Sequence, residues 1–320
     1  VVVVRHSRQP DVNWRPRDKW SHELMTVAVK DILANAQAAG ININTEEELL
    51  ALPADAFVKA LYATSKPELV DAEYPMFFIY TSGSTGKPKG VVHTHGGYVS
   101  GIAYSMKVSF DATPGDVMFV VADPGWITGQ SYMISATLST RMTGIIIEGS
   151  PVFPSAGRFA SIIERYKVNI FKAGVTFLKA IMTDPQNAAD VSHYDMSSLR
   201  VATFCAEPCS PPVQQFGMQL MTPQYINSYW ATEHGGIVWT HFFGNSDFPL
   251  RADAHTYPLP WIMGDVWIGE EEVESPKSKV QSQDGELSPQ PSALGTKYRP
   301  AELEEKGEIV ITAPYPYLAR

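Results

Sequence analysis

The chain has 320 residues, of which 44% are hydrophobic and 18% are charged, and its net charge is −9. The hydrophobic fraction is large enough for a sizeable core, which excludes wholesale disorder. The acidic balance disfavours a duplex nucleic-acid binder, because such proteins normally carry a basic balance. No apolar run approaches the roughly 20 residues of a membrane helix. Two cysteines cannot form a disulfide framework, so the sequence predicts a protein of the reducing cytoplasm.

The first part of the chain is predicted to be helical. One helix is expected over residues 18–40, and Thr45 and Glu48 form a capping box for a second, short helix that stops at Pro53. A third helix is expected over 55–63. These helices show ordinary core periodicity and no evident chemistry. The expected apolar face of the first helix comprises Trp20, Leu24, Val27, Ala28 and Ile32.

Strands and helices alternate after Pro75. Short continuous apolar runs are typical of strands buried inside a sheet, and apolar residues at helical spacing lie between several of these runs. The alternation predicts an α/β fold with a doubly wound sheet of parallel strands flanked by helices. The predicted strands cover residues 76–80, 117–121, 143–147, 168–171, 201–205 and 225–226, and the predicted helices cover 159–166, 175–182 and 213–220.

The composition changes at about residue 245. Prolines there separate aromatic and β-branched runs, which predicts a β-rich subdomain over 245–320. Residues 270–308 hold ten acidic and five basic residues and so carry −5 of the net charge. The part over 270–306 is also poor in large apolar residues, so we expect a flexible acidic insertion. A returning strand is expected over 308–312.

The most informative stretch is the run Tyr80–Gly90, with the sequence YTSGSTGKPKG. Glycine and hydroxyl residues let a backbone fold closely around an anion, and Lys87 and Lys89 add positive charge, which suits a polyphosphate. The run is not a Walker A loop, because Thr81 stands where that loop needs glycine and Pro88 where it needs Ser or Thr. A solvated turn is the simpler alternative, but an ordered run after a strand favours phosphate binding.

This run resembles the signature of the adenylate-forming superfamily, which comprises acyl-CoA synthetases, peptide-synthetase adenylation domains and luciferases. Within that superfamily the chain is most similar to acetyl-CoA and propionyl-CoA synthetases. The resemblance implies the central part of the large N-terminal domain of such an enzyme, with an α/β adenylation core over 1–244, a helical insertion at about 27–72 and no C-terminal lid domain. The supporting segments are 91–98 (VVHTHGGY), 122–129 (ADPGWITG), 206–208 (AEP) and 229–236 (YWATEHGG).

The resemblance also implies a reaction and its cofactors. Such enzymes use ATP and Mg²⁺ to turn a carboxylate into an acyl-adenylate, from which coenzyme A then displaces AMP. Neither step needs a covalent enzyme nucleophile, so catalysis rests on positioning and on stabilising charge at phosphorus. The implied partners are small molecules, namely ATP, a short-chain acid and coenzyme A, with no nucleic acid and no membrane.

The resemblance assigns roles to individual residues. Thr232 would contact the α-phosphate, Lys87 would bind the β- and γ-phosphates, and Glu233 would hold Mg²⁺, which suits a hard carboxylate. These three are the expected catalytic residues. The alternative for Glu233 is an ordinary surface acid. The expected phosphate-binding residues are Thr81, Ser82, Gly83, Ser84, Thr85, Gly86 and Lys87. The expected adenine and nucleotide residues are Ala206 (usually glycine in the family), Glu207, Pro208, Asn227, Ser228, Tyr229, Trp230, Ala231 and Thr232.

An acyl pocket is also implied. Trp230 resembles the tryptophan that closes the pocket floor in short-chain enzymes and leaves room for only a few carbons. Acetate, propionate, acrylate or 3-hydroxypropionate would fit, whereas fatty acids would not. The alternative is that Trp126 and Trp230 are ordinary core aromatics. The expected pocket residues are Trp126, Ile127, Thr128, Cys205 and Trp230.

Two other functions stay open. The chain could be an adenylation domain that loads a carrier protein, or a fragment that binds nucleotide and acid without turnover. The family's ribose-binding aspartate and catalytic lysine belong to segments beyond the matched region, so we expect an incomplete enzyme. The extra segments at 27–72 and 270–306 fit a synthetase module fused to downstream enzyme domains, as in a multifunctional propionyl-CoA synthase.

Overall fold

The chain divides into two compact units, residues 1–70 and 71–320. The computed structural model describes residues 2–3, 19–64, 67–82, 86–245, 247–252, 257–271, 296–302 and 304–319. None of the helices in these ranges combines the length and the apolar character that a membrane span requires.

The smaller unit is mainly helical, as the sequence predicts. A short parallel pair joins β1 (Val2–Val3) to β2 (Lys19–Trp20), and the helices are α1 (Ser21–Ala38), α2 (Glu46–Leu50) and α3 (Ala54–Thr64). The Thr45 hydroxyl accepts a hydrogen bond from the Glu48 amide at 3.2 Å, which confirms the predicted cap of α2. Of the expected apolar face of α1, Ile32 packs against the core, whereas Val27 and Ala28 are exposed. The side chains of Trp20 and Leu24 lie outside the described part of the structure. The buried core of this unit consists of Ala36, Ile43, Leu49 and Ala60.

A seven-stranded sheet forms the centre of the larger unit. Its order is β11-β10-β9-β8-β7-β5-β6, and the five strands from β9 to β6 are parallel. This arrangement confirms the predicted α/β class. Because β6 and β7 flank β5 on opposite sides, the strand order reverses there, and such a switch point opens a crevice at the carboxyl ends of the strands. The strands are β5 (Val117–Val120), β6 (Thr143–Ile145), β7 (Ile170–Gly174), β8 (Val201–Cys205), β9 (Tyr225–Tyr229), β10 (Trp239–Thr240) and β11 (Tyr257–Pro258).

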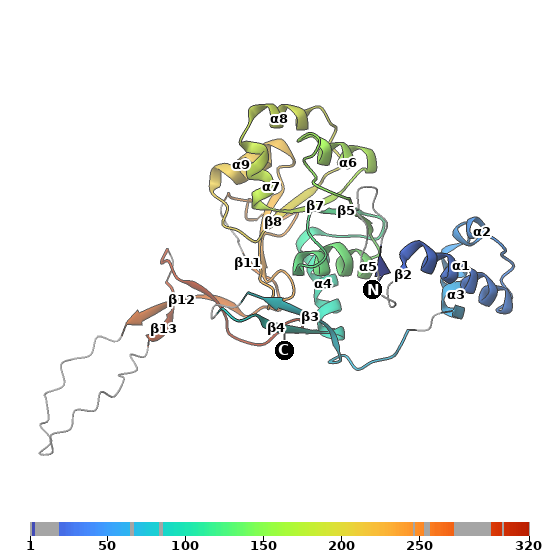
Figure 1. Cartoon of the computed structure of the whole chain (residues 1–320). Coiled ribbons are helices and arrows are strands. Elements are labelled where there is room, and N and C mark those ends of the chain that lie inside the picture. Colours follow the sequence, from blue (N-terminus) through green and yellow to red (C-terminus); the bar gives the residue numbers. More distant parts are fainter. Residues whose placement is uncertain are drawn as a thin grey trace, which may run out of the picture. The chain divides into compact units, whose positions relative to one another are not determined.

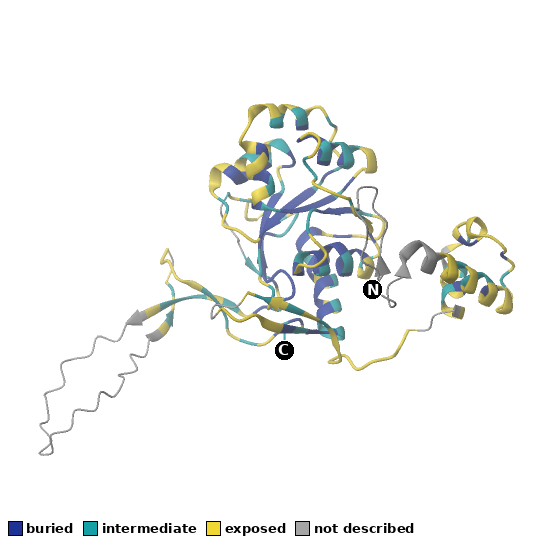
Figure 2. Ribbon diagram, viewed as in Figure 1, coloured by how far each residue is buried: buried dark blue, intermediate teal, exposed yellow. Residues whose placement is uncertain are grey.

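Helices cover both faces of this sheet (Figure 1). One face packs under α4 (His95–Phe110), the π-helix η1 (Gly129–Ala136) and α5 (Thr137–Ser139), around buried side chains such as Tyr98, Ile102 and Tyr132. The other face packs under α6 (Arg158–Tyr166), α7 (Val175–Met182), α8 (Pro185–Ser192) and α9 (Pro211–Leu220), around Phe159, Phe171 and Leu178. The strands between the two layers are almost continuously buried (Figure 2), which explains their unbroken apolar sequences.

One predicted strand has a different setting. Residues 76–80 were expected inside the parallel sheet, but β3 (Pro75–Thr81) pairs antiparallel with β4 (Lys89–Thr94) in a separate two-stranded sheet. Its side chains alternate, so Phe77 and Ile79 pack on the core while Phe78 and Tyr80 are 64% and 71% exposed. A short apolar run cannot distinguish a strand buried on both faces from an edge hairpin.

The β-rich C-terminal region is present as predicted. β12 (Gly264–Glu271) lies between β13 (Thr296–Pro300) and β14 (Glu308–Ile311) in an antiparallel sheet. The two ends of the acidic stretch expected as a flexible insertion are therefore strands, and residues 272–295 lie outside the described part of the chain.

Candidate functional site

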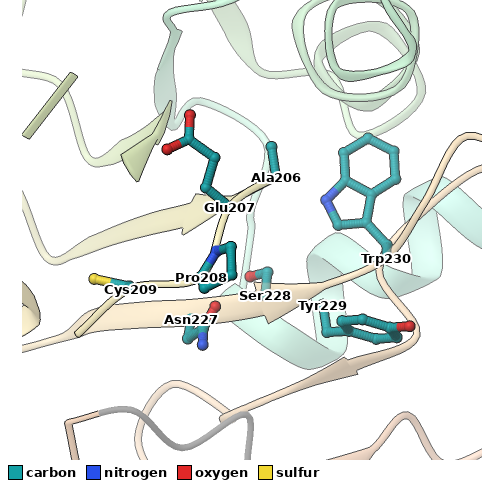
Figure 3. A pocket seen from close by; sticks show the side chains of 8 residues that line it. All are labelled: Ala206, Glu207, Pro208, Cys209, Asn227, Ser228, Tyr229 and Trp230. Atoms are coloured by element: carbon teal, nitrogen blue, oxygen red, sulfur yellow. The ribbon is translucent and has the colours of Figure 1, made fainter. Parts of the chain in front are cut away.

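A cavity of about 350 Å³ lies where β8 and β9 end. Its walls come from the loop that follows β8 and from the last residues of β9, which are neighbours because the two strands are parallel. Figure 3 shows Trp230 and Tyr229 leaving the end of β9 on opposite sides, with Trp230 facing Ala206. Seven of the eight lining residues are those that the resemblance assigns to the nucleotide. The lining residues are Ala206, Glu207, Pro208, Cys209, Asn227, Ser228, Tyr229 and Trp230.

The loop after β8 is held by α7. Glu207 accepts a hydrogen bond from the Thr176 hydroxyl, and its other carboxylate oxygen lies 3.6 Å from Lys179 Nζ. Ala206 has φ +79°, in the left-handed region that favours glycine. The anchored carboxylate therefore fixes a tight turn whose backbone borders the cavity.

Buried hydroxyl groups link β9 to its neighbours β8 and β10 in the sheet. Ser228 Oγ lies 2.6 Å from Thr203 Oγ1 and 3.3 Å from Thr240 Oγ1, which in turn donates to the Asn227 carbonyl at 2.9 Å. All three side chains are buried. Buried hydroxyls that satisfy one another fix the positions of neighbouring strands. The Ser228 hydroxyl is thus engaged within the protein at the position where a nucleotide contact is expected.

Two histidines hold the turn that contains Thr232 and Glu233. His93 Nε2 donates to the Thr232 carbonyl at 3.0 Å, and His234 Nδ1 accepts from the Ala231 amide at 3.0 Å. Burial lowers the pKa of both histidines, although the nearby Glu233 carboxylate acts in the opposite direction. Neutral rings suit these bonds, because Nδ1 of His234 must be unprotonated to accept. Both side chains therefore position the turn, a role that sequence reasoning did not assign.

The Glu233 carboxylate is exposed beside this turn. Mg²⁺ usually keeps several waters and binds one or two carboxylates together with substrate phosphates, rather than a cage of protein ligands. A single exposed carboxylate fits that mode. Within the described residues, no group of three or more His, Cys, Asp or Glu side chains could hold a metal ion.

The residues expected around the acid differ in how far they are buried. Ile127 and Cys205 are buried, Thr128 is half-buried, and Trp230 packs edge-on against Tyr132 with ring centroids 5.1 Å apart. Cys205 ends β8 and directly precedes the cavity loop. Trp126 differs from the others, because its side chain is 72% exposed and is not among those that line the cavity.

The expected phosphate loop connects β3 to β4. Thr81 ends β3, Ser82 and Lys87 are exposed, and Gly86 has φ +78°, a conformation that glycine adopts without strain. Gly83, Ser84 and Thr85 lie outside the described residues. Four of the seven residues expected to bind phosphate are therefore described, namely Thr81, Ser82, Gly86 and Lys87.

Sequence reasoning missed two residues near the cavity. Cys209 lines it, and Lys172 lies fully buried with its Nζ 5.7 Å from the centre of the Trp230 ring. The residue type of Lys172 gave no signal, because lysine is almost never fully buried and is expected at the surface after an apolar run. The predicted strand over 168–171 ends three residues before β7 does, at Gly174, so it excludes Lys172 from the sheet.

Comparison with known proteins identifies the family to which the chain belongs. The profile of the family described as "AMP-binding enzyme" matches residues 8–287. Among similar proteins, the acetyl-coenzyme A synthetase of Methylobacillus flagellatus is 35% identical over 83% of this chain and 36% of its own length. That of Burkholderia thailandensis is 38% identical over 83% and 36%, and that of Paraburkholderia phymatum is 40% identical over 62% and 31%.

The chain thus spans about a third of the length of these relatives. The family match covers most of the chain, and it includes the loop after β3, the loop after β8 and the turn after β9. The chain therefore belongs to the AMP-binding enzyme family, within the adenylate-forming superfamily, and is similar to its AMP-forming acyl-CoA synthetases.

Proposed function

We propose that this chain provides the nucleotide and acid site of an AMP-forming synthetase that joins a short-chain carboxylic acid to coenzyme A. The observation that carries the proposal is the cavity at the ends of β8 and β9, whose walls are the two segments expected to bind the nucleotide. The Thr232–Glu233 turn directly follows one of those walls. Family membership supports the same reading.

The proposed reaction has two displacements. In the first, a carboxylate oxygen of the acid attacks the α-phosphorus of ATP, and pyrophosphate leaves. In the second, the sulfur of coenzyme A attacks the acyl carbon, and AMP leaves. Thr232 would contact the α-phosphate, while Lys87 and the rest of the 81–87 loop would bind the phosphates. Mg²⁺ held at Glu233 would supply positive charge to the phosphate oxygens when bound.

Trp230 would limit the length of the acid. Its indole packs against the buried Tyr132 ring, so it has little freedom to turn aside. A rigid aromatic wall excludes additional methylenes, each worth about 1–3 kcal/mol of discrimination. Acetate, propionate, acrylate and 3-hydroxypropionate remain the proposed substrates, and cytoplasmic ATP and coenzyme A their proposed partners.

Binding of acyl-sulfamoyl adenosines, which mimic the acyl-adenylate, tests the proposal. Titration calorimetry on the 320-residue chain should detect the acetyl, propionyl and 3-hydroxypropionyl compounds and not the octanoyl compound. In Trp230→Gly the octanoyl compound should bind, because the wall is removed, whereas Trp230→Phe keeps a wide ring and should still exclude it. A folded chain that binds none of the short compounds would contradict the proposed site.

A separate measurement concerns turnover. Because the chain spans about a third of its relatives' length, binding without acid-dependent exchange of pyrophosphate into ATP would favour a fragment that holds nucleotide and acid but does not react them. Exchange in the chain alone would show that the described core is sufficient for adenylation.

A further inference from the structure

Lys172 occupies an unusual position for a lysine. It lies on β7 at the point where the strand order reverses, and its side chain has no exposed surface. Its backbone carbonyl accepts a hydrogen bond from the Val121 amide at 2.8 Å, just before the segment expected around the acid. Lys172 is the middle residue of β7 and pairs with Val120, the last residue of β5, so it lies within two residues of the carboxyl ends of both strands, where α/β proteins bind their ligands.

The ammonium group is surrounded by aromatic rings. Lys172 Nζ lies 4.7 Å from the centre of the Tyr132 ring and 5.7 Å from that of Trp230. Cys205 lies on the same face of the sheet, since Lys172 pairs with Thr203 two residues before it. Among the described residues, Nζ forms no ion pair with a carboxylate and no hydrogen bond of regular geometry, and the polar group that interacts with it is the Cys205 thiol.

A buried ammonium without a carboxylate partner is costly. Contacts with aromatic faces recover about 2 kcal/mol or somewhat more when desolvated, whereas an unpaired charge inside a protein costs several kcal/mol. Burial accordingly lowers the pKa of Lys172, and the Cys205 thiol offsets part of this change. Packing alone does not explain the residue, because a methionine would fill a similar volume without a polar group.

We infer that Lys172 is a specificity-determining residue of the acyl pocket, whose Nζ binds a hydroxyl group on the third carbon of a short-chain acid. This inference rests on the proposed function. Among the four acids that the proposed function allows, it favours 3-hydroxypropionate. Nζ is close to both Trp230, which lines the cavity, and Cys205, which directly precedes the cavity loop, and these are two of the side chains expected around the acid. An acyl chain held beside these two side chains would bring its third carbon toward Nζ.

A hydroxyl group suits this position better than a second carboxylate does. It can accept a hydrogen bond from an ammonium or exchange hydrogen bonds with a neutral amine, so it matches the lysine in either protonation state. A carboxylate would require the lysine to stay charged in an apolar, aromatic environment that disfavours charge. The apolar remainder of the pocket, including Ile127 and Trp230, suits a three-carbon chain.

A matched set of ligands tests the inference. The 3-hydroxypropionyl, propionyl and malonyl forms of sulfamoyl adenosine differ only at the third carbon, and calorimetry gives their affinities for the chain and for Lys172→Met. We expect the chain to bind the hydroxylated compound about tenfold to a hundredfold more tightly than the propionyl compound, the usual range for a hydrogen bond to a charged group. Lys172→Met should abolish that difference and leave propionyl binding unchanged or tighter.

Lys107→Met is the control, because it makes the same change at an exposed lysine on α4. For Lys107→Met, the ratio of the affinities for the 3-hydroxypropionyl and propionyl compounds should equal that of the unaltered chain. Thermal unfolding should show that both variants are folded. The inference is overturned if Lys172→Met keeps the preference for the hydroxylated compound, if the chain shows no such preference, or if malonyl binds most tightly. In contrast, failure of all three compounds to bind would overturn the proposed function itself.

Discussion

At the scale of single residues, the loop after β8 carries backbone strain at the cavity. Ala206 has φ +79°, where a Cβ atom crowds the following carbonyl, and its neighbour Glu207 is tied to α7 by Thr176 and Lys179. The anchored carboxylate keeps Ala206 in a conformation that alanine disfavours. The tight turn lets the backbone border the cavity closely.

Ala206→Gly should therefore stabilise the chain. Glycine adopts this backbone angle freely, and the relief outweighs its greater loss of chain entropy, so the free energy of unfolding should rise by up to about 1 kcal/mol. Denaturant unfolding measures the change. Ala202→Gly, within β8 and fully buried, is the matched control and should lower the free energy of unfolding. A loss of stability in Ala206→Gly would show that the turn is not strained.

Sequence motifs identify the residues that line the cavity, but they do not predict contacts between residues that are distant in sequence. The segments 206–208 and 227–230 could be identified from sequence because the residue types stand in order along the chain, and these segments line the cavity. The surroundings of Lys172 could not be predicted, because Tyr132 and Trp230 come from distant elements. Likewise, His93 reaches Thr232 across 139 positions, which no local pattern encodes.

At the scale of elements, the sequence pattern predicts where a strand or helix lies, but it does not predict strand pairing or an unusual helix type. The strand over 201–205 and the helix over 175–182 match the structure to the residue. The strand over 76–80 exists, but its pairing depends on partners that a short apolar run does not specify. The π-helix η1 was not predicted either, although Ser131 and Tyr132 within it bind the Gly235 carbonyl and the Ile237 amide.

The turn between β9 and β10 depends on Gly235. Its φ is +75°, and a Cβ atom there would lie 2.8 Å from the Tyr317 carbonyl oxygen and 2.9 Å from His93. Gly235→Ala should therefore lower the free energy of unfolding by about 2–4 kcal/mol, through backbone strain and overpacking together. It should also weaken binding of acyl-sulfamoyl adenosines, because the Thr232–Glu233 turn would shift.

Gly174→Ala is the matched control for this turn. Gly174 has φ −77° and nothing within 4 Å of the position a Cβ atom would take, so alanine should change the stability by less than about 1 kcal/mol. Denaturant unfolding of the two variants gives the comparison. If Gly235→Ala and Gly174→Ala had equal free energies of unfolding, the close approach of Tyr317 and His93 would not restrict the residue at position 235.

At the scale of the larger unit, burial of histidines makes folding depend on pH. Burial lowers the pKa of His93, His234 and His241 below the ordinary value of 6.5. As the pH falls through 6.5, the unfolded chain therefore binds protons that the folded chain does not. Stability rises with pH wherever the unfolded state binds more protons, so the free energy of unfolding should fall as the pH drops from about 7 to 5.

The contribution of the histidines to this pH dependence has an upper limit, and a variant can separate it from the contribution of the carboxylates. Each histidine contributes at most about 1.4 kcal/mol per pH unit. The carboxylates Asp195 and Glu305, whose pKa values are lowered to about 2 by hydrogen bonds from Ser197 and Arg299, lose their contributions at lower pH. Denaturant unfolding at pH 7 and pH 5.5 should therefore show a smaller difference for His93→Gln, which keeps a donor for the Thr232 carbonyl but cannot titrate. The same change at the exposed His193 should leave the difference intact, and an unaltered slope in His93→Gln would contradict the assignment.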